Sequence, residues 1–204
     1  MQKTLFTYLI LTIFCILNSY GQEEYHFEPG KGGNSEISGL HLGVNANFLF
    51  PTGGITGNTY SSGLGAGIFA KYILESRIGV GASANYDFLN FRGGAAPGIT
   101  TSLRNINGLI EYYFGDGSTP FLGAEFGYYS LRTNYSTATS GTGNSVNTPS
   151  VSSFGFAPYL GYIFGLSEKI FLSGNIKYIR TLNSLIGVTP TQFIQLNLGL
   201  SYKL

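Results

Sequence analysis

From Ile37 to the C-terminus, the chain contains long segments in which apolar side chains recur at every second position. The clearest stretch is 40–50, where polar or small residues separate Leu40, Leu42, Val44, Ala46, Phe48 and Phe50. Successive side chains of a β-strand point to opposite faces, so this period predicts a strand rather than a helix. The strand has one apolar face and one face that is polar or small.

Seven further segments repeat the alternation, and each is predicted to be a strand: 63–75, 77–89, 102–114, 120–132, 153–165, 169–181 and 192–204. Each is about 13 residues long, whereas strands of soluble proteins most often have about 5–6 residues. A strand tilted by about 45° needs roughly 9–11 residues to cross the hydrocarbon core of a bilayer. The lengths therefore indicate strands that span a membrane.

The connections between these strands alternate strictly between short and long. The short ones are 75–77, 115–119 and 166–169, and the long ones are 51–62, 90–101, 133–152 and 182–191. Barrels of bacterial outer membranes have short periplasmic turns and long external loops. Because the first strand leads into a long loop, both chain ends are expected on the periplasmic side. The fold class predicted for residues 37–204 is all-β, a transmembrane antiparallel up-and-down β-barrel of eight strands.

The composition is typical of a protein whose outer surface is not entirely in contact with water. Charged residues make up 10% of the chain, whereas soluble domains average about 25%. The net charge of +1 gives no long-range field for nucleic acid, which is excluded as a partner. A soluble barrel of the lipocalin type is the structural alternative, but its charges would cover the outer faces of the strands. Such charges are sparse here.

The first 21 residues are typical of a signal peptide. Lys3 precedes an apolar stretch from Leu5 to Leu17, and Ser19 and Gly21 are small residues at the positions that a signal peptidase reads. The stretch is short of the roughly 20 residues of a transmembrane helix, and a buried or anchoring helix is the alternative. We expect a signal peptide at 1–21 and a flexible periplasmic lead-in at 22–36. Cys15 would leave with the signal peptide.

Five charged residues fall on the more polar faces of the predicted strands: Lys71, Asp87, Glu111, Glu125 and Lys177. A Lys or Arg on the lipid face at the bilayer midplane costs about 2–4 kcal/mol, so these charges are expected to face the lumen. An eight-stranded interior is just wide enough for side chains to fill. We therefore predict a structural network of these charges.

The glutamates and a histidine also suggest two catalytic roles as alternatives to the structural one. Glu111 and Glu125 flank the turn 115–119 at nearly matching positions, and two close carboxylates are the acid/base pair of glycoside hydrolases. The structural role is favoured, because either lysine could compensate them across a narrow lumen. His41 is the one histidine on a predicted strand, on its inward face, and no serine nearby suggests itself as a nucleophile. Neither a cofactor nor a metal site is expected.

The signal peptide, the eight strands and the closing residues 198–204 (LGLSYKL) resemble the OmpA-like and opacity-type outer-membrane β-barrel superfamily. The resemblance covers nearly all of the mature chain. It implies a location in the bacterial outer membrane, the lipid bilayer and the barrel-assembly machinery as partners, and a luminal salt-bridge network that plugs the barrel. Members usually end their last strand in an aromatic residue, whereas this chain ends in Leu204, two residues after Tyr202.

These observations predict a non-enzymatic outer-membrane barrel with a structural or surface-interaction role. A narrow channel for small or apolar solutes is the alternative, and a lipid-modifying barrel enzyme is a third hypothesis. The loops 90–101 and 133–152 are rich in small and polar residues. Long loops of this kind are often functional, so they are the predicted site for an extracellular ligand.

Overall fold

The computed structural model describes residues 37–52, 54–92, 99–136, 145–147, 150–185 and 190–204. Eight long strands make up most of this part of the chain: β1 Gly39–Pro51, β2 Tyr60–Ile73, β3 Ile78–Phe91, β4 Ile99–Tyr113, β5 Thr119–Ser136, β7 Val151–Gly165, β8 Ile170–Thr181 and β9 Gln192–Lys203. A short helix, α2 (Gly54–Thr59), and a three-residue strand, β6 (Ser145–Asn147), lie in the connections. The predicted signal peptide 1–21 and lead-in 22–36 lie outside the described residues.

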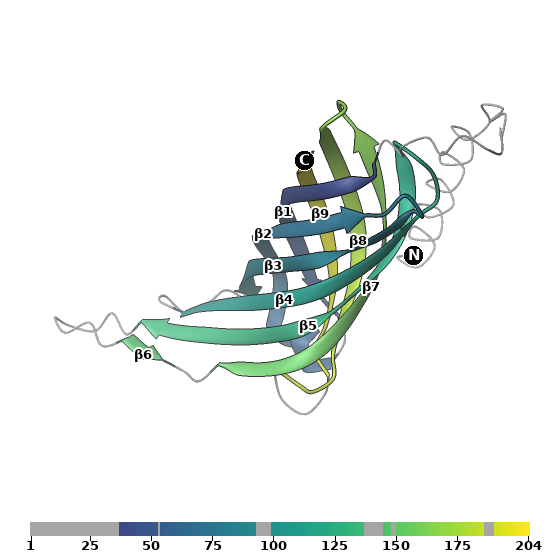
Figure 1. The fold of residues 1–204 in the computed structure, drawn as a ribbon. Helices are drawn as coiled ribbons and strands as arrows, with labels where there is room; N and C mark the ends of the chain where they lie inside the picture. Colours follow the sequence, from purple (N-terminus) through teal and green to yellow (C-terminus); the bar gives the residue numbers. More distant parts are fainter. Residues whose placement is uncertain (1–36, 53, 93–98, 137–144, 148–149, 186–189) are drawn as a thin grey trace, which may run out of the picture. The chain divides into compact units, whose positions relative to one another are not determined.

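The eight long strands close into a barrel (Figure 1). Each pairs antiparallel with the next long strand along the chain, β4 pairs with β5, and β1 pairs with β9. Closure gives every strand a partner on both edges, so that backbone groups within the membrane are hydrogen-bonded. The predicted all-β, eight-stranded antiparallel barrel is confirmed, with strand ends that differ from the predicted ones by a few residues.

The two ends of the barrel differ as predicted. At the turn end, three tight connections at 74–77, 114–118 and 166–169 join neighbouring strands. Arg77 and Gly117 have positive φ angles of 66° and 81° in two of these turns. The guanidinium of Arg77 forms an exposed ion pair of 3.2 Å with Asp116, which links two turns. The other connections are long and lie at the opposite end, which we call the loop end.

One long connection contains more structure than its composition predicted. The segment 133–152 was expected to be loop throughout, but β5 continues to Ser136 and pairs there with β6. Figure 1 shows β5 and β6 projecting together at the loop end. Continuing the ladder pairs backbone donors and acceptors that would otherwise need water, so a polar sequence can still extend the strand. Residues 137–144 and 148–149 lie outside the described residues.

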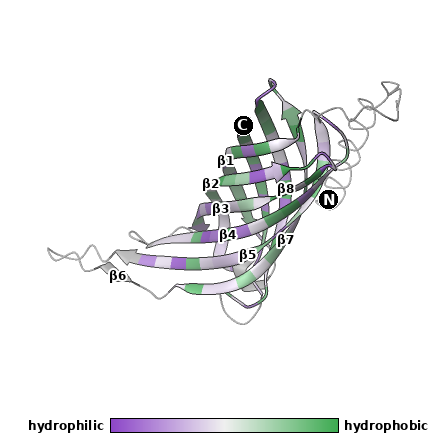
Figure 2. Ribbon diagram, viewed as in Figure 1, coloured by the Kyte–Doolittle hydropathy of each residue, from purple (hydrophilic) through white to green (hydrophobic). Residues whose placement is uncertain are grey.

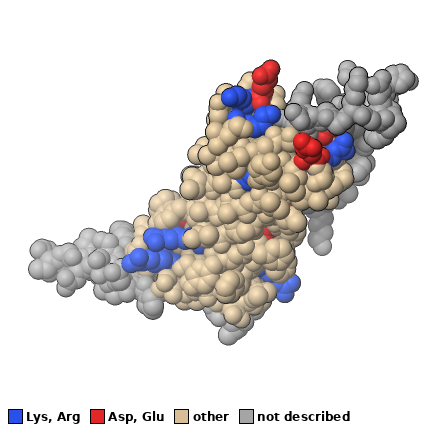
Figure 3. All heavy atoms as spheres, in the orientation of Figure 1, with Lys and Arg blue, Asp and Glu red and all other residues tan. Residues whose placement is uncertain are grey.

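The outer wall of the barrel is apolar. Outward side chains such as Ile106, Phe126 and Leu198 are 70%, 63% and 59% exposed, and Figure 2 shows hydrophobic positions recurring along each strand. Figure 3 shows that the middle of the visible wall carries almost no charge, with charged side chains towards the two ends. A band of this kind is stable in contact with lipid but not with water. The barrel is therefore a transmembrane one, and the soluble alternative is wrong.

Apolar clusters close the interior at both ends. The loop-end cluster is formed by Leu49, Tyr60, Leu89, Leu103, Tyr129, Leu131, Ala157, Ile179, Leu185 and Phe193. The turn-end cluster is formed by Ile37, Ile73, Tyr113, Phe121, Tyr159, Ile163 and Phe171. Between the two clusters the inward residues are mostly polar or charged. Two apolar layers thus enclose a polar layer at mid-depth.

Glycines in β2 make room for this polar layer. The segment 63–67 (GLGAG) superficially resembles a phosphate-binding loop, but its three glycines lie on the inward positions of a strand. A Cβ at Gly67 would overlap the side-chain oxygens of Asn85 and Asn45 and lie 2.7 Å from the carbonyl oxygen of Ala84. The glycine is required because the neighbouring strand places amide groups in its side-chain volume.

We predict that Gly67→Ala lowers the free energy of unfolding by about 1–3 kcal/mol, as overpacking of an interior does. Gly174→Ala is the matched control, because no heavy atom lies within 4 Å of a Cβ placed at that position. Its effect should stay within about 0.5 kcal/mol. The measurement is urea-induced unfolding in lipid vesicles, followed by heat-dependent gel mobility. Equal losses in the two variants would contradict this account of the interior.

Candidate functional site: the charged interior

The five charged residues predicted to face the lumen all lie inside the barrel. Lys71, Asp87, Glu111, Glu125 and Lys177 come from five different strands, and none is more than 5% exposed. Charges at membrane depth are stable only when they pair with each other or with other polar groups. The partners of each therefore decide what the interior can do.

The first ion pair joins β2 to β4. Lys71 Nζ lies 3.0 Å from Glu111 Oε2, and the hydroxyl groups of Tyr113 and Tyr159 donate hydrogen bonds to the same carboxylate, the latter at 2.9 Å. The ammonium group also lies 5.5 Å from the ring centroid of Phe121. Three donors and nearby aromatic faces compensate a buried charge pair better than the ion pair alone.

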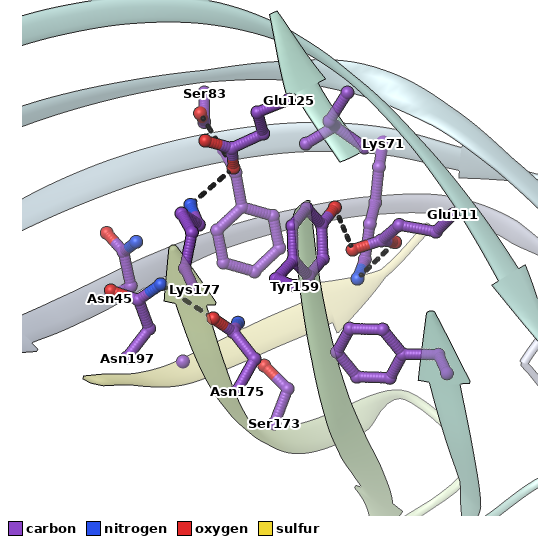
Figure 4. Close-up of a pocket in the computed structure, with 14 residues that line it drawn as sticks. Asn45, Lys71, Ser83, Glu111, Glu125, Tyr159, Ser173, Asn175, Lys177 and Asn197 are labelled. Atoms are coloured by element: carbon purple, nitrogen blue, oxygen red, sulfur yellow. Dashed lines mark hydrogen bonds and ion pairs between the residues drawn. The ribbon is translucent and has the colours of Figure 1, made fainter. Parts of the chain in front are cut away.

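The second ion pair joins β5 to β8 (Figure 4). Lys177 Nζ lies 2.6 Å from Glu125 Oε1. Ser83 donates to the same oxygen at 3.4 Å, and the Asn107 amide donates to Oε2 at 3.0 Å. The Lys177 ammonium lies 5.2 Å from the ring centroid of Tyr159. This carboxylate too has three donors, so the two pairs are built alike.

Each ion pair reaches across one intervening strand. Small residues lie opposite both members of the first pair and opposite the glutamate of the second. Lys71 lies opposite Gly81 of β3, and Gly79 of β3 lies opposite Glu111. On the other side of the barrel, Ala157 of β7 lies opposite Glu125, whereas Tyr159 of β7 lies opposite Lys177. A larger inward side chain at the two glycine positions or at Ala157 would fill space that the paired side chains cross. The small residues therefore permit pairing between strands that are not neighbours.

The two glutamates do not form the close carboxylate pair that was considered from the sequence. In the β4–β5 register Glu111 lies opposite Gly123 and Glu125 lies opposite Leu109, so the two are offset by two positions. All four carboxylate oxygens accept hydrogen bonds within the interior. Neither group has an oxygen left to act on a glycosidic bond, and the geometry favours the structural role.

Asp87 is the exception among the five. Its Oδ1 accepts a hydrogen bond of 2.8 Å from the Asn47 amide. Its Oδ2 has no hydrogen-bond partner, and no lysine or arginine of the described residues lies within ion-pair distance of it. The structure thus brings four of the five predicted residues into two pairs and leaves Asp87 beside an amide.

An asparagine chain, which was not singled out from the sequence, links these groups. The amides of Asn45 and Asn47 donate to Asn85 Oδ1, and those of Asn85 and Asn107 donate to Asn105 Oδ1, at 2.8–3.1 Å. Asn107 then donates to Glu125, which joins the chain to the second ion pair. The signal in the sequence was the recurrence of asparagine at inward positions of β1, β3 and β4.

A small cavity lies inside the polar layer. A cavity of about 30 Å³ lies between the two ion pairs, with Lys71, Glu111, Glu125 and Lys177 among its lining residues (Figure 4). Because one water needs about 10–15 Å³, the cavity has room for about two water molecules. Among the described residues, no group of three His, Cys, Asp or Glu side chains could hold a metal ion. No helix in this part of the chain is long and apolar enough to cross a bilayer.

His41 lies at the turn end beside a serine that sequence order did not suggest. Closure of β1 on β9 brings His41 Nδ1 to 3.5 Å from Ser201 Oγ, and His41 Nε2 lies 2.7 Å from the carbonyl oxygen of Ile37. A hydroxyl group beside a histidine that a third group orients is the arrangement of a nucleophile activated by a base. However, His41 is fully buried and packs edge-on against Phe171 at 5.0 Å. The arrangement faces the packed interior and not the lipid.

Comparison with solved structures places this geometry among small outer-membrane barrels. Neisserial surface protein A matches with a TM-score of 0.58 and 18% identity, over 82% of this chain and 98% of that one. The outer membrane protein OprG from Pseudomonas aeruginosa matches with a TM-score of 0.57 and 16% identity, over 86% and 99%. No protein-family model matches the chain, and no curated protein matches its sequence. The likeness establishes the fold, that of a small eight-stranded outer-membrane barrel.

We predict strong coupling between Lys71 and Glu111. Lys71→Met should lower the free energy of unfolding by about 3–5 kcal/mol, because it leaves a buried carboxylate without its counter-ion. Glu111→Gln should also lower the free energy of unfolding, because it leaves the buried Lys71 ammonium without its counter-ion. The double variant should lose much less than the sum of the two, because it buries no net charge. The measurement is the same urea unfolding in vesicles, and simple additivity of the two losses would show that the pair is not coupled.

Proposed function

We propose that this chain is a non-enzymatic outer-membrane barrel whose closed lumen is a structural element and whose role lies in the envelope or at its surface. The observation that carries the proposal is the filled interior. Two apolar clusters enclose a layer in which both lysines are paired with glutamates. The cavity between the two ion pairs has room for about two waters, which is too little for a solute or a substrate.

The proposal includes the route by which the barrel reaches the membrane. Residues 1–21 act as a cleaved signal peptide, 22–36 as a periplasmic lead-in, and 37–204 as the barrel. Insertion then requires the barrel-assembly machinery as a partner. The apolar wall and the short turns opposite long loops support this orientation, with the loop end facing outside.

The loop end is where contact with the surroundings is proposed. The segments 90–101 and 133–152 carry the small and polar residues that make adaptable hydrogen bonds. The extension of β5 and its pairing with β6 give the second segment a base of paired strands. Such a base supports a role in binding an extracellular ligand.

A planar-bilayer measurement tests the closed lumen. We expect the refolded mature protein to produce no stepwise conductance in molar potassium chloride, because the two ion pairs and both apolar clusters block the interior. A heat-dependent mobility shift on the same sample confirms that the inserted protein is folded. Discrete conductance steps from a folded sample would refute the closed lumen and favour the narrow channel for small or apolar solutes.

The lipid-modifying hypothesis now has one concrete candidate, the contact between His41 and Ser201. We expect the purified barrel to hydrolyse phosphatidylcholine at the background rate, with Ser201→Ala unchanged, because both residues are buried. The measurement is fatty-acid release from mixed micelles. Release by the wild type that Ser201→Ala abolishes, with Ser173→Ala as a matched buried control that retains it, would overturn the non-enzymatic proposal.

A further inference from the structure

The charges outside the lumen are distributed unevenly between the two ends of the barrel. The loop end carries Arg92, Arg104, Arg132 and Arg180 and no acidic residue, since the acidic residues after position 36 lie in the lumen or in the short turns. The turn end mixes both signs, with Glu75, Arg77, Asp116, Glu168 and Lys169. An anion therefore meets an unopposed positive surface only at the loop end.

Two of the arginines lie close together on the wall. Figure 3 shows basic side chains gathered over the loop ends of β4 and β5. In the registers, Arg104 of β4 lies opposite Tyr86 of β3, and Arg132 of β5 lies opposite Ser102 of β4. The Arg104 guanidinium lies over the ring of Tyr86, 4.9 Å from its centroid. Arg132 lies two positions beyond Ser130, the register partner of Arg104, on the same face of the wall.

These side chains lie at the height of lipid headgroups. On β4 and at Phe114, the residue that follows it, the outward residues are apolar or glycine over the nine positions 106–114. On β5 the outward residues are apolar over the nine positions 120–128. Roughly 9–11 residues cross the hydrocarbon core. Arg104 and Ser130, which lie opposite each other, are therefore the first polar residues beyond it.

The same wall carries apolar and polar contacts side by side. Directly below the arginines, Ile106 and Phe126 are 70% and 63% exposed. Next to Arg132, Ser130 accepts a hydrogen bond of 3.0 Å from Ser152 of β7, so hydroxyl groups continue the polar surface. Among anions, a lipid can place its acyl chains against the apolar side chains and its charged headgroup against the arginines and hydroxyl groups.

We propose that Tyr86, Arg104 and Arg132, the arginine cluster, bind the phosphate group of a phosphorylated lipid in the outer leaflet. A guanidinium donates two parallel hydrogen bonds to a phosphate and is the preferred residue for planar bidentate recognition. The contact with the Tyr86 ring restricts the Arg104 guanidinium before the lipid arrives, which lowers the entropy lost on binding. The site lies on the wall and is independent of the closed lumen.

Native mass spectrometry of the folded barrel in a neutral detergent tests the site, with dimyristoyl phosphatidic acid as the probe. The double variant Arg104→Gln/Arg132→Gln should lower its apparent affinity at least tenfold. The matched control is Arg180→Gln, which removes one exposed arginine at the loop end of β8, away from the cluster. It should change the affinity less than twofold. The heat-dependent mobility shift should be retained by all variants, since these side chains lie outside the packed interior.

Three results would overturn the proposal. Equal binding of a diacylglycerol with the same chains would mean that acyl contacts alone hold the lipid. A loss in Arg180→Gln as large as in the double variant would mean that diffuse charge, and not a cluster, attracts it. Competition by inorganic phosphate at the concentration of the lipid would identify a soluble phosphate as the ligand.

Discussion

Closing eight strands leaves an interior no wider than the side chains that fill it, and no bulk water reaches the middle of that interior. Every polar group placed there has to find its partner inside the barrel. Polar groups find such partners in the two Lys–Glu pairs, in the tyrosine hydroxyl groups and in the asparagine chain. The glycines of β2 and β3 contribute indirectly, because they leave room for side chains from other strands.

The strands could be predicted because the lipid and the interior impose opposite preferences on alternate residues, which appears in the sequence as a period of two. The inward position of Lys71 and Glu111 follows from the same pattern. Their pairing does not, since β2 and β4 are separated by β3 and the contact depends on two registers and on Gly79 and Gly81. Which charges pair across an intervening strand depends on how several strands are aligned, and the pattern within one strand does not contain that information.

The same reason explains His41 and Ser201. The two residues are 160 positions apart, and only the β1–β9 pairing brings them within 3.5 Å. The extension of β5 to Ser136 escaped prediction for another reason. Beyond the membrane neither face of a strand meets lipid, so the alternation that identifies a strand disappears while the backbone ladder continues.

Because side chains fill the interior, a ligand would be recognised by the outer surface of the barrel. Outside the lumen, the loop end and the rim where the apolar belt stops are the surfaces on which basic side chains occur without acidic neighbours. On β4 and on β8 the apolar run ends at an arginine, Arg104 and Arg180. The Arg104 guanidinium lies 4.9 Å from the ring centroid of Tyr86, and a second arginine, Arg132, lies two positions away along the neighbouring strand. Because a lone guanidinium can satisfy itself in water at the rim, it is this grouping, rather than the charge itself, that distinguishes a binding site from an ordinary membrane boundary.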